Sequence, residues 1–318
     1  MTVSIVIPCY NHGRFLAEAI DSALTQSWRD CEVVVVDDGS TDESAQVMAQ
    51  YAEIRVVRQE NRGLAAARNA GLHVARGDVL IFLDADDRLW PDAARCGVKL
   101  LRARPDAALV FGRCQLVNER GLPLPTTLPR VRARFFERLL LDNYIWTPGM
   151  VAFRRAVFDV VGGFDESISA AADYDIYLRI TRQFPVANHS AITVDYRQHA
   201  DNMSRDPVLM LDATLAALRG QRPFVLDDSE RAEIYRRAMI RWRLCYGERL
   251  VEQFRTALRR RDATVALAAG WHLLRLYPAG VRHHMHKKLR LMVRQDVTPR
   301  PAPESPTDNP EPQSAARP

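Results

Sequence analysis

The sequence of 318 residues has few cysteines and no long apolar run. Its five cysteines are an odd number, lie far apart and form no CxxC pair, so neither a disulfide framework nor a structural zinc site is expected. Reduced thiols of a cytosolic protein fit this pattern better. The longest apolar runs, such as residues 79–83 and 265–269, fall far short of the roughly 20 residues that span a bilayer. No basic segment precedes the first apolar run, so no signal peptide is expected.

The charge of the chain is distributed unevenly. The formal net charge is +5, but residues 231–297 contain sixteen Lys or Arg and five acidic residues, a net +11, which leaves −6 for the rest. This cationic stretch has two interpretations: a solvated helical surface that favours arginine, or a surface that meets anionic lipid head groups. No nucleic-acid-binding module is recognisable, so no nucleic-acid partner is expected.

Short apolar runs alternate with amphipathic stretches in the first hundred residues. This rhythm predicts an α/β fold with right-handed crossovers and a mostly parallel sheet covered on both faces. The predicted strands, rich in Val and Ile, are residues 3–7, 32–36, 54–57 and 78–83, and the helices between them are residues 14–26, 42–51 and 64–75.

After the first hundred residues, the pattern of predicted elements changes twice, first to helices alone and then to a Pro-rich tail. Further elements are predicted as a helix from near Pro91, strands at 107–111, 150–153 and 191–196, helices at 135–141 and 174–183, and a long surface loop at 116–134. Beyond residue 207 only helical periodicity remains, with breaks at 220–223 and 278–280. The division we expect is therefore 1–210 for the α/β domain, 211–297 for a basic helical region and 298–318 for a disordered Pro-rich tail.

Acidic residues follow two of the predicted strands, at the sheet edge where ligands of open parallel sheets collect. Asp37 stands at a strand tip with no evident packing or capping role, so its carboxylate is free to accept hydrogen bonds from a base or ribose. Asp84 and Asp86 follow the apolar run VLIFL and, as alternate residues of an extended segment, can face one ligand together. Mg²⁺ or Mn²⁺ prefers such oxygen ligands. In the alternative interpretation, Asp87 caps the next helix and the other carboxylates are solvated.

The segment ENRGLAAARNAGL, residues 60–72, contains no GxGxxG, so a dinucleotide-binding fingerprint is not supported. Gly63 opens a helix of small residues from which Arg68 projects. A helix N-terminus together with an arginine suits a diphosphate. An Ala-rich helix packed on the sheet, with Arg68 in a salt bridge, explains the segment equally well.

Four motifs occur in order: VSIVIPCYN, VVVVDDGSTD, ENRGLAAARNAG and LIFLDADD. Together they resemble family 2 glycosyltransferases of the GT-A fold, and the resemblance continues through GGFDE, AADYDIYLRI and YRQHADNMS over about two-thirds of the chain. It implies a GT-A, Rossmann-like sandwich that binds a nucleotide-diphospho-sugar, with the C-terminal helices as an appendage.

The resemblance also implies roles for single residues at the donor site. Asp37 matches the acidic residue that contacts the nucleotide base, and Pro8 and Tyr10 line the same pocket. Arg68 matches the arginine of the nucleotide-binding segment. Asp84 is the first aspartate of the DxD pair and is implied to face the ribose.

The metal and the general base are implied in the same way. Asp86 matches the metal ligand of the DxD pair, and His199 resembles a histidine that approaches the metal or the diphosphate, although a hydrogen-bonded surface histidine is an alternative. Asp173 aligns with the second acid of a Glu-Asp motif and is implied to be the general base. Ala172 replaces the glutamate of that motif, and a shifted register would give the role to Asp175.

These expectations define a hypothesis for the whole chain. It is an inverting glycosyltransferase that requires Mn²⁺ or Mg²⁺, and the donor we expect is a UDP-sugar. The acceptor would be a hydroxyl of a glycan, glycolipid or other glycoconjugate in polysaccharide or cell-envelope synthesis. A cytoplasmic enzyme is expected, with peripheral contact to an anionic membrane through the basic helices. The alternatives are transfer to a lipid phosphate and a catalytically silent module that binds sugar nucleotides; a nucleotidyltransferase fits poorly because PCYNHGRF is not a Gly-rich basic segment.

Overall fold

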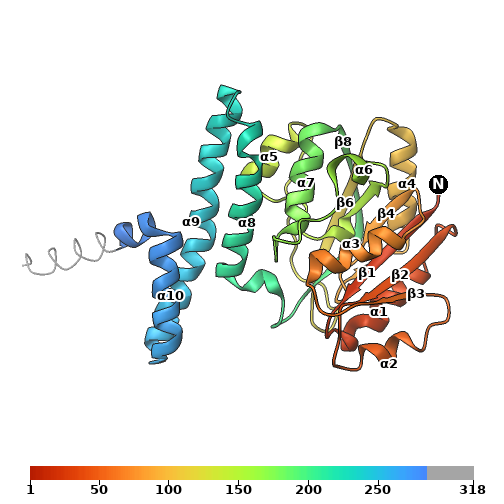
Figure 1. Cartoon of the computed structure of the whole chain (residues 1–318), viewed down its shortest axis with the longest axis horizontal. Coiled ribbons are helices and arrows are strands. Elements are labelled where there is room, and N and C mark those ends of the chain that lie inside the picture. The colour runs from red at the N-terminus through yellow and green to blue at the C-terminus, as the bar shows by residue number, and fades with distance from the viewer. Residues whose placement is uncertain (285–318) are drawn as a thin grey trace, which may run out of the picture. The chain divides into compact units, whose positions relative to one another are not determined.

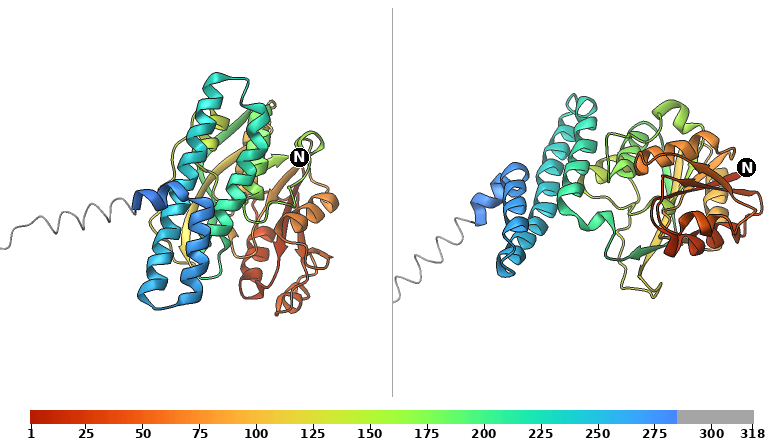
Figure 2. Two further views of the ribbon diagram at one scale, coloured as in Figure 1. Left: turned by 60° about the vertical axis from the view of Figure 1, so that its left-hand side comes forward. Right: turned by 60° about the horizontal axis from the view of Figure 1, so that its bottom comes forward.

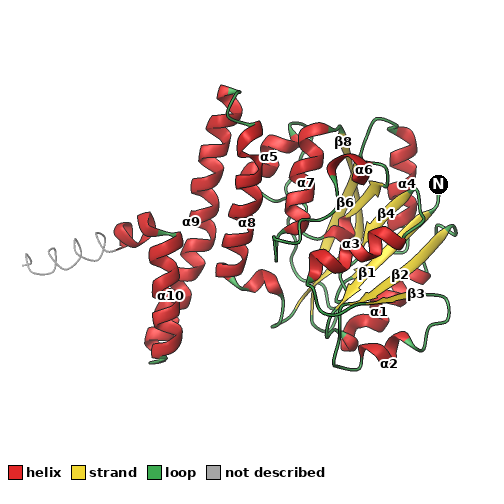
Figure 3. Ribbon diagram, in the orientation of Figure 1, coloured by secondary structure: helices red, strands yellow, loops and turns green. Residues whose placement is uncertain are grey.

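The computed structural model describes residues 1–284, and Met1–Tyr277 form one compact unit. Within this unit the sheet and its covering helices occupy one half and three long helices the other (Figure 3). Within residues 1–284, every helix is too short or too polar to cross a bilayer.

One sheet of eight strands, in the order β3-β2-β1-β4-β7-β6-β8-β5, runs through the described part of the chain. Its first half is parallel, as expected: β1 pairs with β2 and β4, and β2 with β3. Its second half is mixed, because β7 runs antiparallel to both β4 and β6. The strands are β1 Val3–Cys9, β2 Cys31–Asp37, β3 Arg55–Arg58, β4 Val79–Phe82, β5 Arg88–Leu89, β6 Leu109–Asn118, β7 Val151–Arg154 and β8 Val186–Gln198.

Helices cover both faces of the sheet: α3 packs on one face of β1 and β2, and α1 with α2 lies on the other (Figures 1 and 2). The α-helices are α1 Gly13–Leu24, α2 Ser44–Met48, α3 Leu64–Val74, α4 Ala93–Ala103, α5 Phe135–Leu141, α6 Val157–Val161, α7 Ala172–Gln183, α8 Pro207–Gln221, α9 Ser229–Arg259 and α10 Ala263–Leu276. Short 3-10 helices lie at η1 Pro148–Met150, η2 Met203–Arg205 and η3 Arg222–Phe224.

The small residues of α3 allow it to lie unusually close to the sheet. A Cβ atom added to Gly71 would be 2.2 Å from a methyl carbon of Val6, so glycine is required there. All seven residues of β1 are buried, as expected for a central strand covered on both faces. This packing fixes the start of α3, and with it Arg68, relative to the strand ends.

The long helices are joined to the α/β part by packing and by hydrogen bonds at α5. Trp242 of α9 donates its indole N–H to the Leu140 carbonyl at 2.8 Å, and Tyr174 of α7 donates to the Leu139 carbonyl at 2.7 Å. Each long helix begins after an aspartate that accepts backbone N–H groups of its first turn, a favourable N-cap. These aspartates are Asp206, Asp228 and Asp262.

Several predicted boundaries differ from those observed. The first three residues of the predicted loop at 116–134 belong to β6, where pairing with β8 extends the strand. Strand β5 and helix α6 were not predicted, since both are too short to show periodicity. The helical region also has a break that was not predicted, at Arg261, whose φ of +58° ends the run of α9.

The predicted domain division is only partly covered by the described residues. The boundary at residue 210 falls inside α8, within the unit Met1–Tyr277, and remains a prediction. The predicted break at 220–223 includes the last two residues of α8 and the start of η3. The break predicted at 278–280 lies one residue earlier, at Tyr277, and residues 278–284 are helical. Residues 285–297 of the basic region and the tail at 298–318 lie outside the described residues.

Candidate functional site

A cavity of about 440 Å³ opens at the carboxyl ends of β1, β2 and β4. Pro8 and Tyr10 line it after β1, and Arg68 reaches it from α3. The opposite side of the cavity is formed by α7, α8 and α9. This is the sheet edge at which parallel α/β sheets bind ligands, and it brings together most of the residues singled out in the sequence.

Asp84 and Arg68 form an ion pair inside this cavity. The guanidinium Nη2 lies 2.7 Å from the Asp84 carboxylate, and the Arg68 side chain is only 3% exposed. Its Nε is buried and has no hydrogen-bond partner among the described residues, which is unusual for a buried donor. Both interpretations of the α3 segment are therefore realised, because the same arginine makes a salt bridge and borders the cavity.

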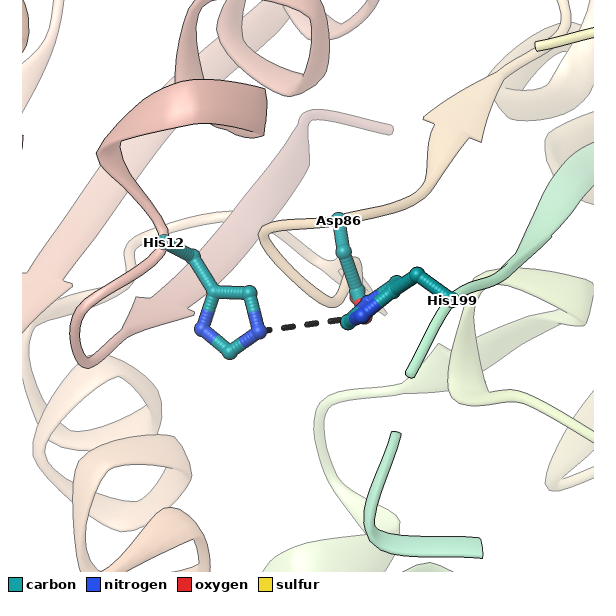
Figure 4. Close-up of side chains that lie close together, drawn as sticks. All are labelled: His12, Asp86 and His199. Atoms are coloured by element: carbon teal, nitrogen blue, oxygen red, sulfur yellow. Dashed lines mark hydrogen bonds and ion pairs between the residues drawn. The ribbon is translucent and has the colours of Figure 1, made fainter. Parts of the chain in front are cut away.

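Asp86 is the centre of a group that can hold a metal ion. Its Oδ2 lies 2.8 Å from Nε2 of His199 and 3.9 Å from Nε2 of His12, and the three ligand atoms lie within 4.8 Å of one another. Figure 4 shows the three side chains converging from separate segments. His12 donates from Nδ1 to the Tyr10 carbonyl at 2.8 Å, which leaves the Nε2 lone pair facing Asp86.

The loop that carries the two aspartates is anchored by buried neighbours. Arg197 donates from Nε to the Asp86 carbonyl at 2.7 Å, and its own backbone N–H donates to the Asp87 carboxylate at 2.9 Å. Asp87 also accepts from the Thr147 hydroxyl at 2.9 Å. Burial raises the pKa of Asp87 well above its ordinary value, and the Asp86 and Asp84 carboxylates add to the shift. Asp87 therefore anchors this loop to β8 rather than capping a helix.

Asp37 does not line the cavity, and its role at the nucleotide base stays a prediction. Its carboxylate accepts the Ser40 backbone N–H at 2.9 Å, which closes the turn after β2. The neighbouring Asp38 lines the cavity instead and accepts the Gly63 N–H at 2.9 Å. Adjacent residues at a strand end point to opposite sides, so only one of the two can face the ligand.

Asp173 lines the cavity from the first turn of α7, whereas Asp175 does not. Desolvation raises the pKa of Asp173 to about 6; Arg68 opposes the shift and Asp84 adds to it. Asp175 instead pairs with Arg179 at 2.7 Å and is buried in the fold. The cavity therefore supports the register in which Asp173 is the reactive carboxylate.

The long helices supply the far wall of the cavity, which the sequence did not predict. Met210 and Thr214 come from α8, and Trp242 and Tyr246 from α9. The rings of Trp242 and Tyr246 stack with centroids 5.8 Å apart. This wall is apolar and aromatic, in contrast to the charged sheet edge.

The family model for glycosyl transferase family 2 matches residues 4–162, half of the chain. The chain belongs to this family. The matched segment holds β1 to β7 and the DxD loop, so the resemblance seen in the four ordered motifs is confirmed.

Curated relatives of the transferase include two polysaccharide synthases. It is 29% identical over 219 residues to chondroitin synthase of Escherichia coli, covering 64% of this chain and 30% of that protein. It is 30% identical over 219 residues to hyaluronan synthase of Pasteurella multocida, covering 64% of this chain and 21% of the synthase. The chain thus spans less than a third of the length of these two relatives.

Solved structures share the fold over a larger part of the transferase. S. aureus TarS 1–349 in complex with UDP-GlcNAc is 19% identical, with a TM-score of 0.56 over 85% of this chain and 90% of that one. The mannosyltransferase PcManGT from Pyrobaculum calidifontis, in complex with GDP-Man and Mn2+, is 20% identical, with a TM-score of 0.56 over 91% of this chain and 80% of that one. The predicted GT-A fold with a helical C-terminal region is confirmed.

The ligand atoms around Asp86 suit a divalent cation. One carboxylate oxygen and two imidazole nitrogens within reach of one ion form a partial ligand set, which leaves positions for oxygens of a diphosphate. His199 is fully buried and touches Asp86 without lining the cavity itself, so the alternative of a surface histidine is wrong. The sequence reasoning missed His12, although a histidine three residues after β1 stands at the same sheet edge as the DxD pair.

Proposed function

We propose that this family 2 glycosyltransferase moves a sugar from a nucleoside diphosphate donor to an acceptor hydroxyl in an inverting, metal-dependent reaction. The observation that carries the proposal is one cavity bordered by the DxD aspartates, by Arg68 and by Asp173, a carboxylate whose pKa is raised to about 6. A UDP-sugar is the donor we expect, and a glycan, glycolipid or other glycoconjugate of an envelope or polysaccharide pathway is the acceptor.

At the donor end, the chain offers charge of both signs to a nucleotide. Arg68 borders the cavity and supplies positive charge for a diphosphate, while Asp84 can accept from ribose hydroxyls. Pro8, Tyr10 and Asp38 border the part of the cavity where a base would lie. A divalent cation held by Asp86, His199 and His12 would neutralise charge on the departing diphosphate.

At the other side, Asp173 can receive the proton of the attacking hydroxyl. Its pKa of about 6 means that the carboxylate is ionised near neutral pH yet basic enough to accept a proton. It enters the cavity from α7, whereas the DxD aspartates enter from the end of β4. Base and leaving group on different sides support a single displacement with inversion, which requires no nucleophilic residue.

The aromatic wall of α8 and α9 is where we place the acceptor. Trp242 and Tyr246 present a rigid surface, and Asn143 and Thr214 supply polar atoms among them. A mostly apolar lining with a few polar groups is typical of sites that orient a small molecule. Helices α8 and α9 then belong to the catalytic unit.

Transfer to a lipid phosphate is a second candidate, favoured by the exposed apolar side of α10, where Leu267 is 76% exposed. A sugar phosphodiester product would identify it. A silent sugar-nucleotide-binding module, suggested by Ala172, is disfavoured because Asp173 is retained in the cavity. We also propose that the enzyme acts on the cytoplasmic side of a cell envelope, in peripheral contact with the membrane.

The first experiment is a thermal-shift screen of nucleotide sugars with and without Mn²⁺. A bound donor raises the unfolding midpoint by mass action, and the rise should depend on Mn²⁺. Donors that bind are then tested for transfer. Recovery of intact donor in the presence of every acceptor class would leave only the silent binding module.

The second experiment separates donor binding from chemistry. Asp173→Asn should keep donor affinity and lower transfer by about a hundredfold to ten-thousandfold, the usual contribution of a general base. Asp175→Asn is the matched control, because it lies two residues away on α7 and faces the fold instead of the cavity. If only the Asp175 variant loses transfer at unchanged stability, the assignment of the base is wrong.

A further inference from the structure

Helix α10 has one side packed on the fold and an opposite side that is apolar and exposed. Leu267, Trp271 and Leu274 are 76%, 66% and 61% exposed. Their spacing of four and three residues places them in one stripe along the helix. The buried side consists of Ala266, Ala269, Leu273 and Leu276. Figures 1 and 2 show α10 as the helix of Met1–Tyr277 farthest from the sheet.

This stripe is not the scattered exposure that every protein surface has. Of the sixteen large apolar residues exposed among the described residues, nine lie between residues 224 and 274. Single exposed apolar residues need no explanation. A continuous stripe of two leucines and a tryptophan, however, is typical of a site that binds a protein or a membrane.

Positive charge exceeds negative charge at the N-terminal end of α10, where three arginines precede Asp262. The last residue of α9, Arg259, and the two residues that follow it, Arg260 and Arg261, are all exposed. Arg259 pairs with Glu252 at 3.3 Å, but Arg260 and Arg261 form no ion pair with any described residue. Helix α10 contains no acidic residue. A partner that is apolar and negatively charged would complement this surface.

We propose that the α10 face, defined as Leu267, Trp271 and Leu274 with Arg260 and Arg261, docks on an anionic lipid surface. Leucine and tryptophan on one side of a helix with arginines beside them are typical of helices that lie in the membrane interface. Each arginine near an anionic leaflet adds attraction. A second copy is the poorer occupant, because α10 has no acidic residue to pair with the exposed Arg260 and Arg261 of another copy.

The test uses the full chain and sedimented vesicles of phosphatidylcholine, alone or with about a third phosphatidylglycerol, at about 0.1 M salt. We expect stronger binding to the anionic vesicles and a loss of that preference at high salt. Leu267→Ser with Leu274→Ser should weaken binding to anionic vesicles about tenfold or more, since two apolar side chains no longer leave water. Arg260→Ala with Arg261→Ala should remove about fivefold per arginine, and only from the anionic preference.

The matched control is Leu122→Ser with Val160→Ser, two residues that are 59% and 64% exposed outside the α10 face. It should leave vesicle binding unchanged, and thermal unfolding should show that all variants are folded. Equal binding by the leucine variant and the parent chain would overturn the proposal. So would a dimer in sedimentation velocity that the leucine variant abolishes while neither protein binds vesicles. Because donor binding is measured separately, failure of the proposed transferase reaction would leave these results unaffected.

Discussion

The two ends of the cavity differ in chemistry although they form one site. The sheet edge presents Asp84, Asp86 and Arg68, whose charges lie within hydrogen-bonding distance of partners. The helical wall presents Trp242 and Tyr246, which interact by ring stacking and burial. A charged end can stabilise a diphosphate as it leaves, whereas an aromatic wall distinguishes ligands by shape. Changes at the first end should therefore affect chemistry and donor binding, and changes at the second should affect acceptor recognition.

Asp86→Asn should have the largest combined effect, because it should remove donor binding as well as transfer. The variant keeps the shape of the side chain but removes the only carboxylate of the metal-binding group of His12, Asp86 and His199. We expect Mn²⁺-dependent donor binding to disappear and transfer to fall about a hundredfold to a thousandfold as well, the usual cost of one lost electrostatic stabiliser. Isothermal titration of Mn²⁺ with the nucleotide measures binding directly. Unchanged turnover would show that Asp86 does not hold the metal and would remove the contrast between the two ends.

The pH dependence tests the base at the boundary between the two ends. Because the pKa of Asp173 is raised to about 6, its carboxylate takes up a proton as pH falls through 6, and transfer should drop about tenfold for each further pH unit. The charged and titratable groups around it are Arg68 of α3, Asp84 after β4, Tyr177 of α7 and Tyr246 of α9. A kcat profile without an inflection near pH 6 would argue against this role.

The same raised pKa has a consequence for stability with a definite sign. The folded protein binds a proton at Asp173 more readily than the unfolded chain, so the ionised carboxylate destabilises the fold above pH 6. Asp173→Asn should therefore raise the unfolding midpoint by about a few degrees at pH 8, a gain that shrinks as pH falls toward 4. Scanning calorimetry at the two pH values checks this.

How much the sequence could predict also differs between the two ends. Residues at the sheet edge act through charge, so Asp84, Asp86 and Arg68 stand out as residue types that a core does not use. The direction in which a side chain points could not be predicted at the same edge. The sequence favours Asp37 as the residue that contacts the base, whereas Asp38 lines the cavity. Tyr246 and Trp242 resemble ordinary core residues in sequence, because only the packing of α9 against α8 and α5 places them at the cavity.

His12→Gln should give the next smaller effect and sharpen the description of the charged end. The imidazole is already oriented by its bond to the Tyr10 carbonyl, so losing it removes a prepared ligand while Asp86 and His199 remain. We expect the Mn²⁺ concentration for half-maximal donor binding to rise about tenfold to a hundredfold. His73→Gln, on the last turn of α3 and outside the cavity, is the control. If both variants behave like the parent chain, the metal is held by Asp86 and His199 alone.

Met210→Ala should have the smallest effect and probes the helical wall by itself. Met210 lines the cavity from α8, where truncation removes apolar contact area without touching a charged group. We expect the KM for the acceptor to rise about threefold to tenfold, since one partly buried apolar side chain is lost, with donor affinity and the Mn²⁺ requirement unchanged. Leu209→Ala, the preceding residue of the same helix, does not line the cavity and should leave both constants unchanged. If the Met210 variant weakens donor binding as much as acceptor binding, the donor must contact both ends of the cavity. The charged end and the helical wall would then not have separate roles.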